Sequence, residues 1–175
     1  KFNSDLPYEL KGNIPKSSYY DHYYGTNRWK ATTIISIAIG QGEVLATPVQ
    51  LANLVAIIAN KGYYYPPHLV KAIGHKDSVN TRFQTKLHVD IEEQYFLPVI
   101  EGMEKAATAG TVRSAAVPGI RMGGKTGTAQ NPHGKDHSIL VCYAPVENPK
   151  IALSVIVENA GFGATWAGPI ASLMI

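Results

Sequence analysis

A glycine-rich segment, Gly123–Gln130, constrains this sequence more than any other stretch. It reads GGKTGTAQ and so combines three glycines, two threonines and a single lysine. Glycines let backbone amides approach a ligand closely, and the lysine adds one positive charge, so we predict an anion-binding segment. Two kinds of site use nearly this string. Residues Gly119–Thr126 satisfy the phosphate-loop pattern G-x-x-x-x-G-K-[ST] in full, and Lys125–Gly127 match the K-[ST]-G triplet of a substrate-binding strand.

The residues around this segment argue against a phosphate loop. Such a loop follows a strand and leads into a helix that begins at its lysine, because the helix N-terminus binds the phosphates. The preceding run Ala115–Pro118 is too short for a buried strand and ends in proline. After Thr126, the residues Pro132 and Gly134 would break a helix in its first turns. We therefore do not expect a nucleotide-binding protein.

The alternative is a strand over Arg121–Gln130, followed by a turn and two antiparallel strands. Thr126 and Thr128 are two residues apart, so on a strand their hydroxyls share one face and can hold one carboxylate. Lys125 and Gly127 alternate to the other face or lie at the pleat edge. A backbone amide on an exposed edge can also stabilise an oxyanion, and losing such a donor costs on the order of a hundredfold or more in rate.

Length and composition indicate one globular domain. The chain has 175 residues, of which 45% are apolar and 17% charged. No run approaches the ~20 apolar residues that span a bilayer. The chain begins at Lys1 and stops within the apolar run Ile170–Ile175, so we expect both ends to be cuts, with an anchor or export signal upstream. The formal charge of +3 is small and scattered, which gives nucleic-acid binding little support.

Cysteine and histidine usage predicts no metal site. The single cysteine, Cys142, lies in an apolar strand-like run and is expected to pack as a small hydrophobe. His133 and His137 are four apart, but Pro132 and Gly134 argue against a helix that would bring them to one face. A closed zinc site also requires four well-placed ligands. We expect neither a metal nor another cofactor.

The first part of the chain is predicted to be irregular and then helical. Residues 1–33 show no clear period and are predicted to form a loop-rich arm. Its tyrosines are expected to pin the arm to the body, and a peptide groove lined by them is the alternative. The run Ile34–Ile39 is too short to distinguish helix from strand. A capping box at Thr47–Gln50 predicts a helix to about Asn60 that stops at Gly62. Its predicted core stripe is Leu51, Leu54, Val55 and Ile58, and its predicted polar side is Gln50, Asn53 and Lys61.

The middle of the chain predicts a strand, a loop and a second helix. His68–Ile73 is predicted to be a short strand and Gly74–Thr85 a loop or hairpin tip. Asp90–Glu93 resembles a capping box for a helix that runs toward Gly110. Pro98 either kinks this helix or begins its regular part. Its predicted apolar face consists of Tyr95, Val99, Met103 and Ala106.

The last third predicts an antiparallel sheet. The apolar runs Ser138–Tyr143 and Ile151–Val157 are predicted to be adjacent antiparallel strands. Because both runs are apolar on each face, we expect helices to cover both sides of the sheet, with Thr165–Ile175 as one covering helix. The predicted fold class is α+β, an antiparallel sheet covered by helices. The predicted parts are the arm 1–33, a mainly helical part 34–118 and a sheet part 119–175.

Four ordered sequence blocks resemble one family. The segment GGKTGTAQ is followed by HSILVCYAPVENPKIALSVIVEN and preceded by IGQGEVLATPVQLANLVAIIANKG and PHLVKAI. Together they resemble the C-terminal half of the transpeptidase domain of class B penicillin-binding proteins, most closely the elongation type. The resemblance implies cross-linking of peptidoglycan: a serine attacks the D-alanyl-D-alanine peptide, and an amine of a neighbouring strand resolves the acyl-enzyme. Penicillins and other beta-lactams acylate the same serine.

The resemblance also implies roles for four residues. Lys125 would support the substrate carboxylate and the proton-transfer network by its charge. The hydroxyls of Thr126 and Thr128 would bind that carboxylate, and the Thr128 backbone amide would form half of the oxyanion hole. Gly127 would keep the strand face clear for the substrate. The family further implies a place on the extracytoplasmic face of the cytoplasmic membrane, with the anchor outside this chain.

Two motifs of the family are missing from the expected places. No serine has a lysine three positions later, so the S-x-x-K nucleophile and base are absent from this chain. Ser78–Asn80 spells S-x-N, but it follows the PHLVKAI block, whereas the family places S-x-N before the segment that resembles Asp5–Glu9; we interpret it as a coincidence. We therefore expect a transpeptidase half-domain that is inactive by itself.

The missing half has structural consequences as well. The resemblance implies that it supplies the nucleophile helix and two strands of a five-stranded sheet. Without them the last strand has a free edge, so we expect self-association or marginal stability. A penicillin-sensing receptor domain, a serine beta-lactamase and a non-enzymatic scaffold remain alternative functions, because the features that separate them lie outside this chain.

Overall fold

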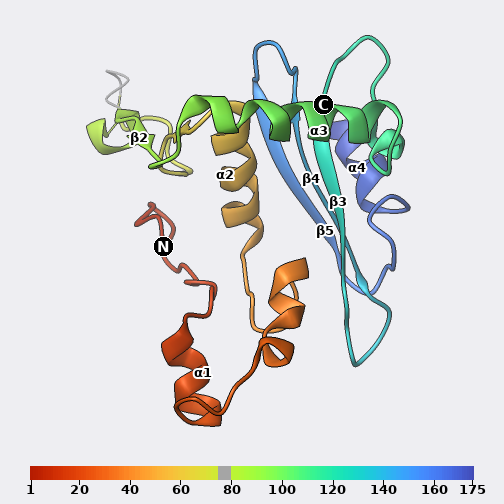
Figure 1. The fold of residues 1–175 in the computed structure, drawn as a ribbon. Helices are drawn as coiled ribbons and strands as arrows, with labels where there is room; N and C mark the ends of the chain where they lie inside the picture. Colours follow the sequence, from red (N-terminus) through yellow and green to blue (C-terminus); the bar gives the residue numbers. More distant parts are fainter. Residues whose placement is uncertain (75–79) are drawn as a thin grey trace. The chain divides into compact units, whose positions relative to one another are not determined.

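Three antiparallel strands form the sheet that carries the glycine-rich segment (Figure 1). The structure is a computed structural model that describes residues 1–74 and 80–175. It divides into two compact units, one made of Lys1–Glu9 with Pro48–Ile175 and the other of Leu10–Thr47. Each unit is described by itself.

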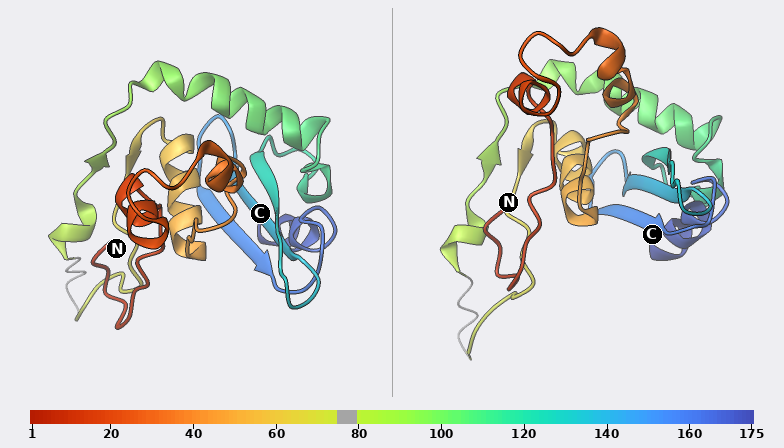
Figure 2. Two further views of the ribbon diagram at one scale, coloured as in Figure 1. Left: turned by 60° about the horizontal axis from the view of Figure 1, so that its bottom comes forward. Right: turned by 90° about the horizontal axis from the view of Figure 1, so that it is seen from below.

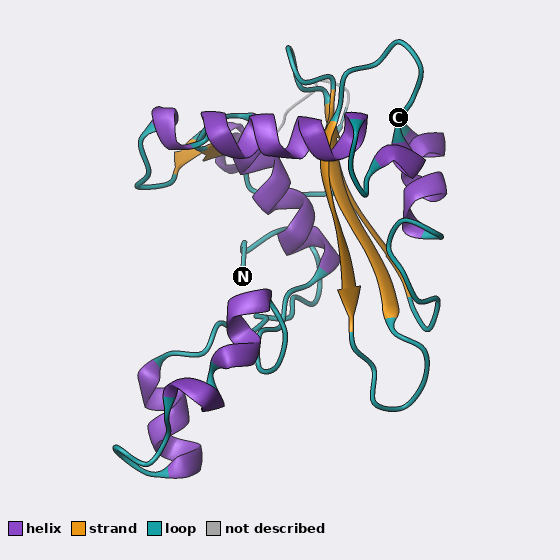
Figure 3. Ribbon diagram, turned by 45° about the vertical axis from the view of Figure 1, so that its right-hand side comes forward, coloured by secondary structure: helices purple, strands orange, loops and turns teal. Residues whose placement is uncertain are grey.

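The sheet has the order β3-β4-β5, and its strands are the long orange arrows in Figure 3. The three strands predicted after residue 120 are confirmed. The strands are β3 (Gly123–Ala129), β4 (His137–Ala144) and β5 (Ile151–Val157). Both pairings are antiparallel, with Lys125 opposite Val141 and Leu140 opposite Val155. β4 and β5 were predicted as short continuous apolar runs, because a strand that is covered on both faces carries apolar side chains on both.

Helices cover both faces of this sheet, as the sequence predicted. On one face, Leu140 and Cys142 of β4 pack with Ala167 and Ala171 of helix α4 (Ala167–Met174). On the other face, Tyr143 packs with residues of helices α2 (Pro48–Ala59) and α3 (Leu97–Thr108), which contribute Val55, Ala59 and Met103. We call these the α4 face and the α2 face. The fold is α+β, as expected, and burial of apolar side chains on both faces stabilises it.

Two neighbouring glycines fix how β3 lies in the sheet. Gly123 faces the ring of Tyr143, and a Cβ there would lie 2.5 Å from Tyr143 Cε1. Gly124 faces the α4 side, where a Cβ would lie 2.9 Å from Cγ1 of the buried Val112. Each glycine therefore makes room for one large side chain, and the two side chains press on the strand from opposite faces.

The first long helix has the predicted bounds but a different buried side. Helix α2 runs from Pro48 to Ala59, close to the predicted end at Asn60. Val55 is fully buried, as predicted, whereas Leu54 is 51% exposed and Asn53 only 9% exposed. The prediction for Leu54 was wrong because Leu54 lies about 100° to one side of the buried residues Val55 and Ala59. The prediction for Asn53 was wrong because the side of the helix nearly opposite Val55, where Asn53 lies, is buried as well.

The second long helix settles the alternative at Pro98. Helix α3 begins at Leu97 and carries Pro98 in its first turn, where a missing N–H costs nothing. The predicted capping box at Asp90–Glu93 is not used, since the segment Glu93–Tyr95 forms a separate 3₁₀ turn. Tyr95 and Val99 are exposed, contrary to prediction, because only the second half of α3 packs on the sheet.

The predicted strand His68–Ile73 is wrong. The backbone amides of Leu69 and Val70 donate hydrogen bonds to the carboxylate of Asp5, at 2.7–3.1 Å. An amide bound to a side chain cannot also serve a strand ladder, so the segment stays irregular although its residues favour strands. The same hydrogen bonds lower the pKa of Asp5. Short strands form instead at β1 (Tyr63–Tyr64) and β2 (Leu87–His88), which pair antiparallel.

The predicted loop Gly74–Thr85 lies partly outside the described residues. Its described end contains the 3₁₀ turn Thr81–Gln84, capped by the Asn80 side chain. Ser78 and Val79 of the S-x-N string are not among the described residues, so the structure does not bear on that string.

The smaller unit, Leu10–Thr47, contains more helix than predicted (Figure 2). Residues Ser17–Tyr24 form helix α1, which the expected loop-rich arm 1–33 did not include. Tyr20 is buried and its hydroxyl donates to Glu43 at 3.2 Å. Trp29 Nε1 donates to Asp21 at 2.8 Å. Aromatic packing within the unit therefore stabilises a helix whose own sequence has no apolar stripe.

The run at residues 34–39, left open between helix and strand, is a 3₁₀ helix over Ile35–Ile39. It ends at Gly40, whose φ of 73° suits glycine. Within residues 1–74 and 80–175, no helix is long and apolar enough to cross a membrane.

We expect Leu140→Ala to lower the free energy of unfolding by about 2–5 kcal/mol, because it leaves a cavity between the sheet and α4. Leu140 has no exposed surface. The matched control is Leu54→Ala in α2, which should cost less than about 1 kcal/mol because Leu54 is half exposed. Urea unfolding followed by circular dichroism measures both, and equal losses would contradict this division into core and surface.

A second pair of variants tests the packing on β3. Gly123→Ala should destabilise the fold by about 1–3 kcal/mol, because its methyl group would overlap the Tyr143 ring. Gly102→Ala is the control: Gly102 lies within α3 with open space around its Cα, so alanine should stabilise the helix by about 0.5–1 kcal/mol. Thermal unfolding should therefore show a lower melting temperature for Gly123→Ala and a higher one for Gly102→Ala. A Gly123→Ala variant as stable as the parent chain would refute the packing argument.

Candidate functional site

The candidate site lies on β3, an edge strand of the described sheet. Within the described residues, β3 pairs with β4 alone, so its other edge is free of strand partners. Lys125 is exposed, and Thr126, Gly127 and Thr128 are half-buried. The strand continues through Lys125 and Thr126 to Ala129. A phosphate loop would need a helix to begin at Lys125, so the structure contradicts that alternative.

The register of β3 sorts the candidate residues onto two faces. Thr126 is opposite Leu140 and Thr128 is opposite Ser138, which places both threonines on the α4 face. Lys125 and Gly127 alternate to the α2 face. The structure therefore brings the two threonine side chains to one face and Lys125 to the other, as the sequence predicted.

A contact of Lys125 indicates which residues of β3 direct their backbone N–H and C=O groups toward the open edge of the sheet. Lys125 Nζ donates to the backbone oxygen of Thr126 at 2.7 Å. In an antiparallel pair, the N–H and C=O of one residue point to the same side, and this side alternates along the strand. A Thr126 carbonyl that accepts from the lysine indicates that Thr126 turns its polar backbone to the open edge. Thr128, two residues on, then presents its amide on that edge as well.

Thr126 has a partner that the sequence did not reveal. The hydroxyls of Thr111 and Thr126 are 2.8 Å apart and share a hydrogen bond. Thr111 lies on the turn that follows α3, fifteen residues before Thr126. Thr111 follows Gly110, just after the end of α3, and no sequence pattern there indicates a contact with β3. Only the tertiary structure identifies the pair.

The serine opposite Thr128 has a structural role. Ser138 is fully buried, and its hydroxyl donates to the Phe162 backbone oxygen at 2.9 Å and accepts from the Ala167 amide at 3.1 Å. It therefore ties the loop before α4 to the sheet. That loop lies close to β3, since a Cβ on Gly163 would be 2.6 Å from the Gly127 backbone oxygen.

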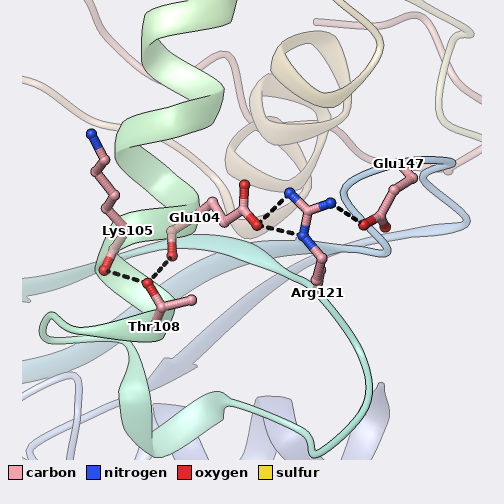
Figure 4. A network of polar contacts seen from close by, with 5 residues as sticks. All are labelled: Glu104, Lys105, Thr108, Arg121 and Glu147. Carbon is pink, nitrogen blue, oxygen red and sulfur yellow. Dashed lines mark hydrogen bonds and ion pairs between the residues drawn. The ribbon is translucent and has the colours of Figure 1, made fainter.

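A charged network holds the segment that enters β3 (Figure 4). Arg121 Nε donates to Glu104 of α3 at 2.7 Å, and its Nη2 lies 2.6 Å from the same carboxylate. Arg121 also binds Glu147, in the turn between β4 and β5. Its hydrogen bond with Glu104 raises the pKa of Arg121. One guanidinium thus joins α3, the start of β3 and the turn from β4 to β5.

Two titratable side chains of β4, Cys142 and Tyr143, are buried in the core. Burial raises the pKa of Cys142 to about 11, so its thiol is protonated and packs as the predicted small hydrophobe. Burial, with the charge of Glu104, raises the pKa of Tyr143 to about 12. His137 Nδ1 accepts a hydrogen bond from the Asn159 amide at 3.1 Å. Among residues 1–74 and 80–175, no three histidine, cysteine or acidic side chains gather to hold a metal ion.

Known proteins match almost the whole chain. The family model of the penicillin binding protein transpeptidase domain matches residues 1–174. The peptidoglycan D,D-transpeptidase MrdA of Acinetobacter baumannii is 33% identical over 95% of the chain, and MrdA of Haemophilus influenzae is 34% identical over 95%. The chain spans only 27% and 29% of these two relatives.

Solved structures show the same likeness. The Pseudomonas aeruginosa PBP2, solved with WCK 5153, is 33% identical with a TM-score of 0.81, over 97% of this chain and 39% of that one. Helicobacter pylori PBP2, solved in complex with MreC, is 26% identical with a TM-score of 0.82, over 99% of this chain and 32% of that one. These matches confirm the resemblance seen in the sequence blocks. The chain belongs to the penicillin-binding protein transpeptidase family, and its similar members are of the PBP2 type.

Proposed function

We propose that the intact protein is a peptidoglycan D,D-transpeptidase and that this chain supplies its substrate-binding strand. The observation that carries the proposal is the arrangement of β3, whose open edge lies beside two threonine hydroxyls on one face and a lysine ammonium. Such an edge can bind an extended peptide as an added strand. The match to the transpeptidase family over residues 1–174 supports a peptide with a terminal carboxylate, D-alanyl-D-alanine, as the ligand.

The threonine hydroxyls and the lysine suit that carboxylate. A carboxylate only accepts hydrogen bonds, so each hydroxyl would donate to one of its oxygens. Bonds to an ionised group are shorter and roughly twice as strong as neutral ones. Lys125 would add a positive charge beside this site, because its ammonium already lies at the backbone of Thr126. The resemblance to the family implies that it also takes part in the proton-transfer network.

The Thr128 amide would stabilise the oxyanion. Attack on the scissile carbonyl places negative charge on its oxygen, and a preorganised N–H stabilises this charge more than it stabilises the substrate. The contact between Lys125 and the Thr126 carbonyl supports an outward-facing Thr128 amide. A second donor would come from the nucleophile's own segment, outside this chain.

Gly127 would leave room for the peptide. A Cβ at this position would lie 3.4 Å from Ile139 Cβ, an ordinary contact, so packing inside the protein does not require glycine here. Gly123 and Gly124 differ, since a Cβ on either would come within 3.0 Å of a neighbour. Glycine at position 127 therefore leaves this face of β3 clear for a ligand that approaches from outside.

The reaction needs a nucleophile from elsewhere in the intact protein. A serine oxygen would attack the carbonyl carbon of the D-alanyl-D-alanine bond, and its proton would pass to a neighbouring base. The terminal D-alanine would leave as the protonated amine, and an amine of a second stem peptide would then displace the serine. Ser138, the serine opposite Thr128 in the sheet, is buried and bonded to Phe162 and Ala167, so it cannot serve.

The same strand would fit two related proteins. A penicillin-sensing receptor domain and a serine beta-lactamase share the K-T-G element, and the features that distinguish them lie beyond this chain. The D,D-transpeptidase names of the relatives favour the transpeptidase. The proposed location is the extracytoplasmic face of the cytoplasmic membrane, with an anchor in another part of the protein.

We expect the chain 1–175 alone to remain unlabelled by a fluorescent penicillin, because no serine in it has the S-x-x-K lysine. The intact protein under the same conditions should be labelled covalently. Denaturing gel electrophoresis separates the two outcomes. A fluorescent band on the 175-residue chain would show that the nucleophile lies within it.

We also expect the isolated chain to self-associate. Within the described residues, β5 pairs with β4 alone and leaves a seven-residue edge open. Unpaired strand edges bind other strands, including copies of themselves. Light scattering after size-exclusion chromatography should give a mass above the 18.9 kDa of one chain. A well-folded monomer across the accessible concentration range would argue against an available edge.

A further inference from the structure

We propose that Thr111 is a positioning residue of the substrate-carboxylate site, acting through the hydroxyl of Thr126. The inference rests on the proposed function of β3. Its direct observation is the 2.8 Å contact between Thr111 Oγ1 and Thr126 Oγ1. A threonine hydroxyl has one proton and two acceptor sites, so a hydroxyl partner can decide where that proton points.

The turn that carries Thr111 is held firmly at both sides. The amides of Gly110 and Val112 both donate to the Ala106 backbone oxygen in the last turn of α3, at 3.1 and 2.9 Å. The Val112 side chain is fully buried and lies against Gly124 of β3. Thr111 thus stands between two fixed neighbours, and Gly124 and Thr126 face the same side of the sheet.

An anionic ligand determines the direction of the hydrogen bonds. The carboxylate only accepts, so Thr126 must donate its single proton to it. The oxygen of Thr126 then accepts from Thr111, which forms a chain from Thr111 through Thr126 to the carboxylate. Each bond in such a chain polarises the next and strengthens it. Without Thr111, the Thr126 hydroxyl would be free to rotate away from the ligand.

The two threonines of β3 are not equivalent in this respect. Within the described residues, the Thr128 side chain makes no hydrogen bond, and its cross-strand neighbour Ser138 is already bonded to Phe162 and Ala167. Thr126 is therefore the hydroxyl of the pair whose orientation the protein controls. Thr111 sets that orientation before the ligand arrives, which is the benefit of preorganisation.

The test uses the intact protein and measures acylation by a penicillin. Thr111→Val keeps the shape and removes the hydroxyl; Thr111→Ser keeps the hydroxyl. The control is Thr108→Val, because the Thr108 hydroxyl bonds only the backbone of α3, at Glu104 and Lys105 (Figure 4). We expect Thr111→Val to weaken pre-covalent binding about five- to tenfold, the loss of one hydrogen bond, with little change in the acylation rate constant. Thr111→Ser and Thr108→Val should stay within about twofold of the parent protein.

A double variant separates positioning from a general structural effect. If Thr111 acts through Thr126, Thr111→Val should have no further effect on a Thr126→Val background. The inference is overturned if Thr111→Val binds penicillin as tightly as the parent protein does, or if Thr111→Ser binds it as weakly as Thr111→Val. It is also overturned if Thr111→Val weakens penicillin binding by the same factor in a protein that already carries Thr126→Val. Failure of the unmutated intact protein to be acylated would instead contradict the proposed function, and this inference with it.

Discussion

The packing of two side chains onto adjacent glycines of β3 fixes the strand on which the candidate site is built. Tyr143 lies against Gly123 on one face, and Val112 lies against Gly124 on the other. Neither contact leaves room for a Cβ, so the strand cannot shift without breaking both. The position of Gly123 and Gly124 is therefore fixed, and the residues that follow, Lys125–Thr128, start from this fixed point and lie along an open edge of the sheet. Rigidity at the start of the strand thus positions the polar groups after it.

Contacts from three distant segments reinforce that position. Arg121 joins the approach to β3 with α3 and with the turn after β4. The turn after α3 brings Thr111 to Thr126, and the loop before α4 lies on Gly127 while Ser138 anchors it. Each segment comes from a different part of the chain, so the strand depends on the whole unit. In the substrate site that we propose, the hydrogen-bond donors are therefore in place before the ligand binds.

The sequence was most informative where a local pattern decides the structure. The three strands, the start of α2 at Pro48 and the rejection of the phosphate loop follow from short apolar runs, capping and helix-breaking residues near in sequence. It failed where a distant group intervenes. The carboxylate of Asp5 takes the amides of Leu69 and Val70, 64 and 65 residues away, and prevents a strand there. The Thr111–Thr126 pair and helix α1 likewise depend on tertiary contacts, which no local pattern encodes.

We propose that β3 binds the substrate carboxylate and stabilises the oxyanion of a serine transpeptidase. A crystal structure of the intact protein acylated by a penicillin tests it directly. We expect the penicillin carboxylate to lie within about 3 Å of the Thr126 and Thr128 hydroxyls, and the acyl carbonyl oxygen at the same distance from the Thr128 amide. An acylated protein whose penicillin carboxylate and carbonyl oxygen contact neither threonine would contradict it.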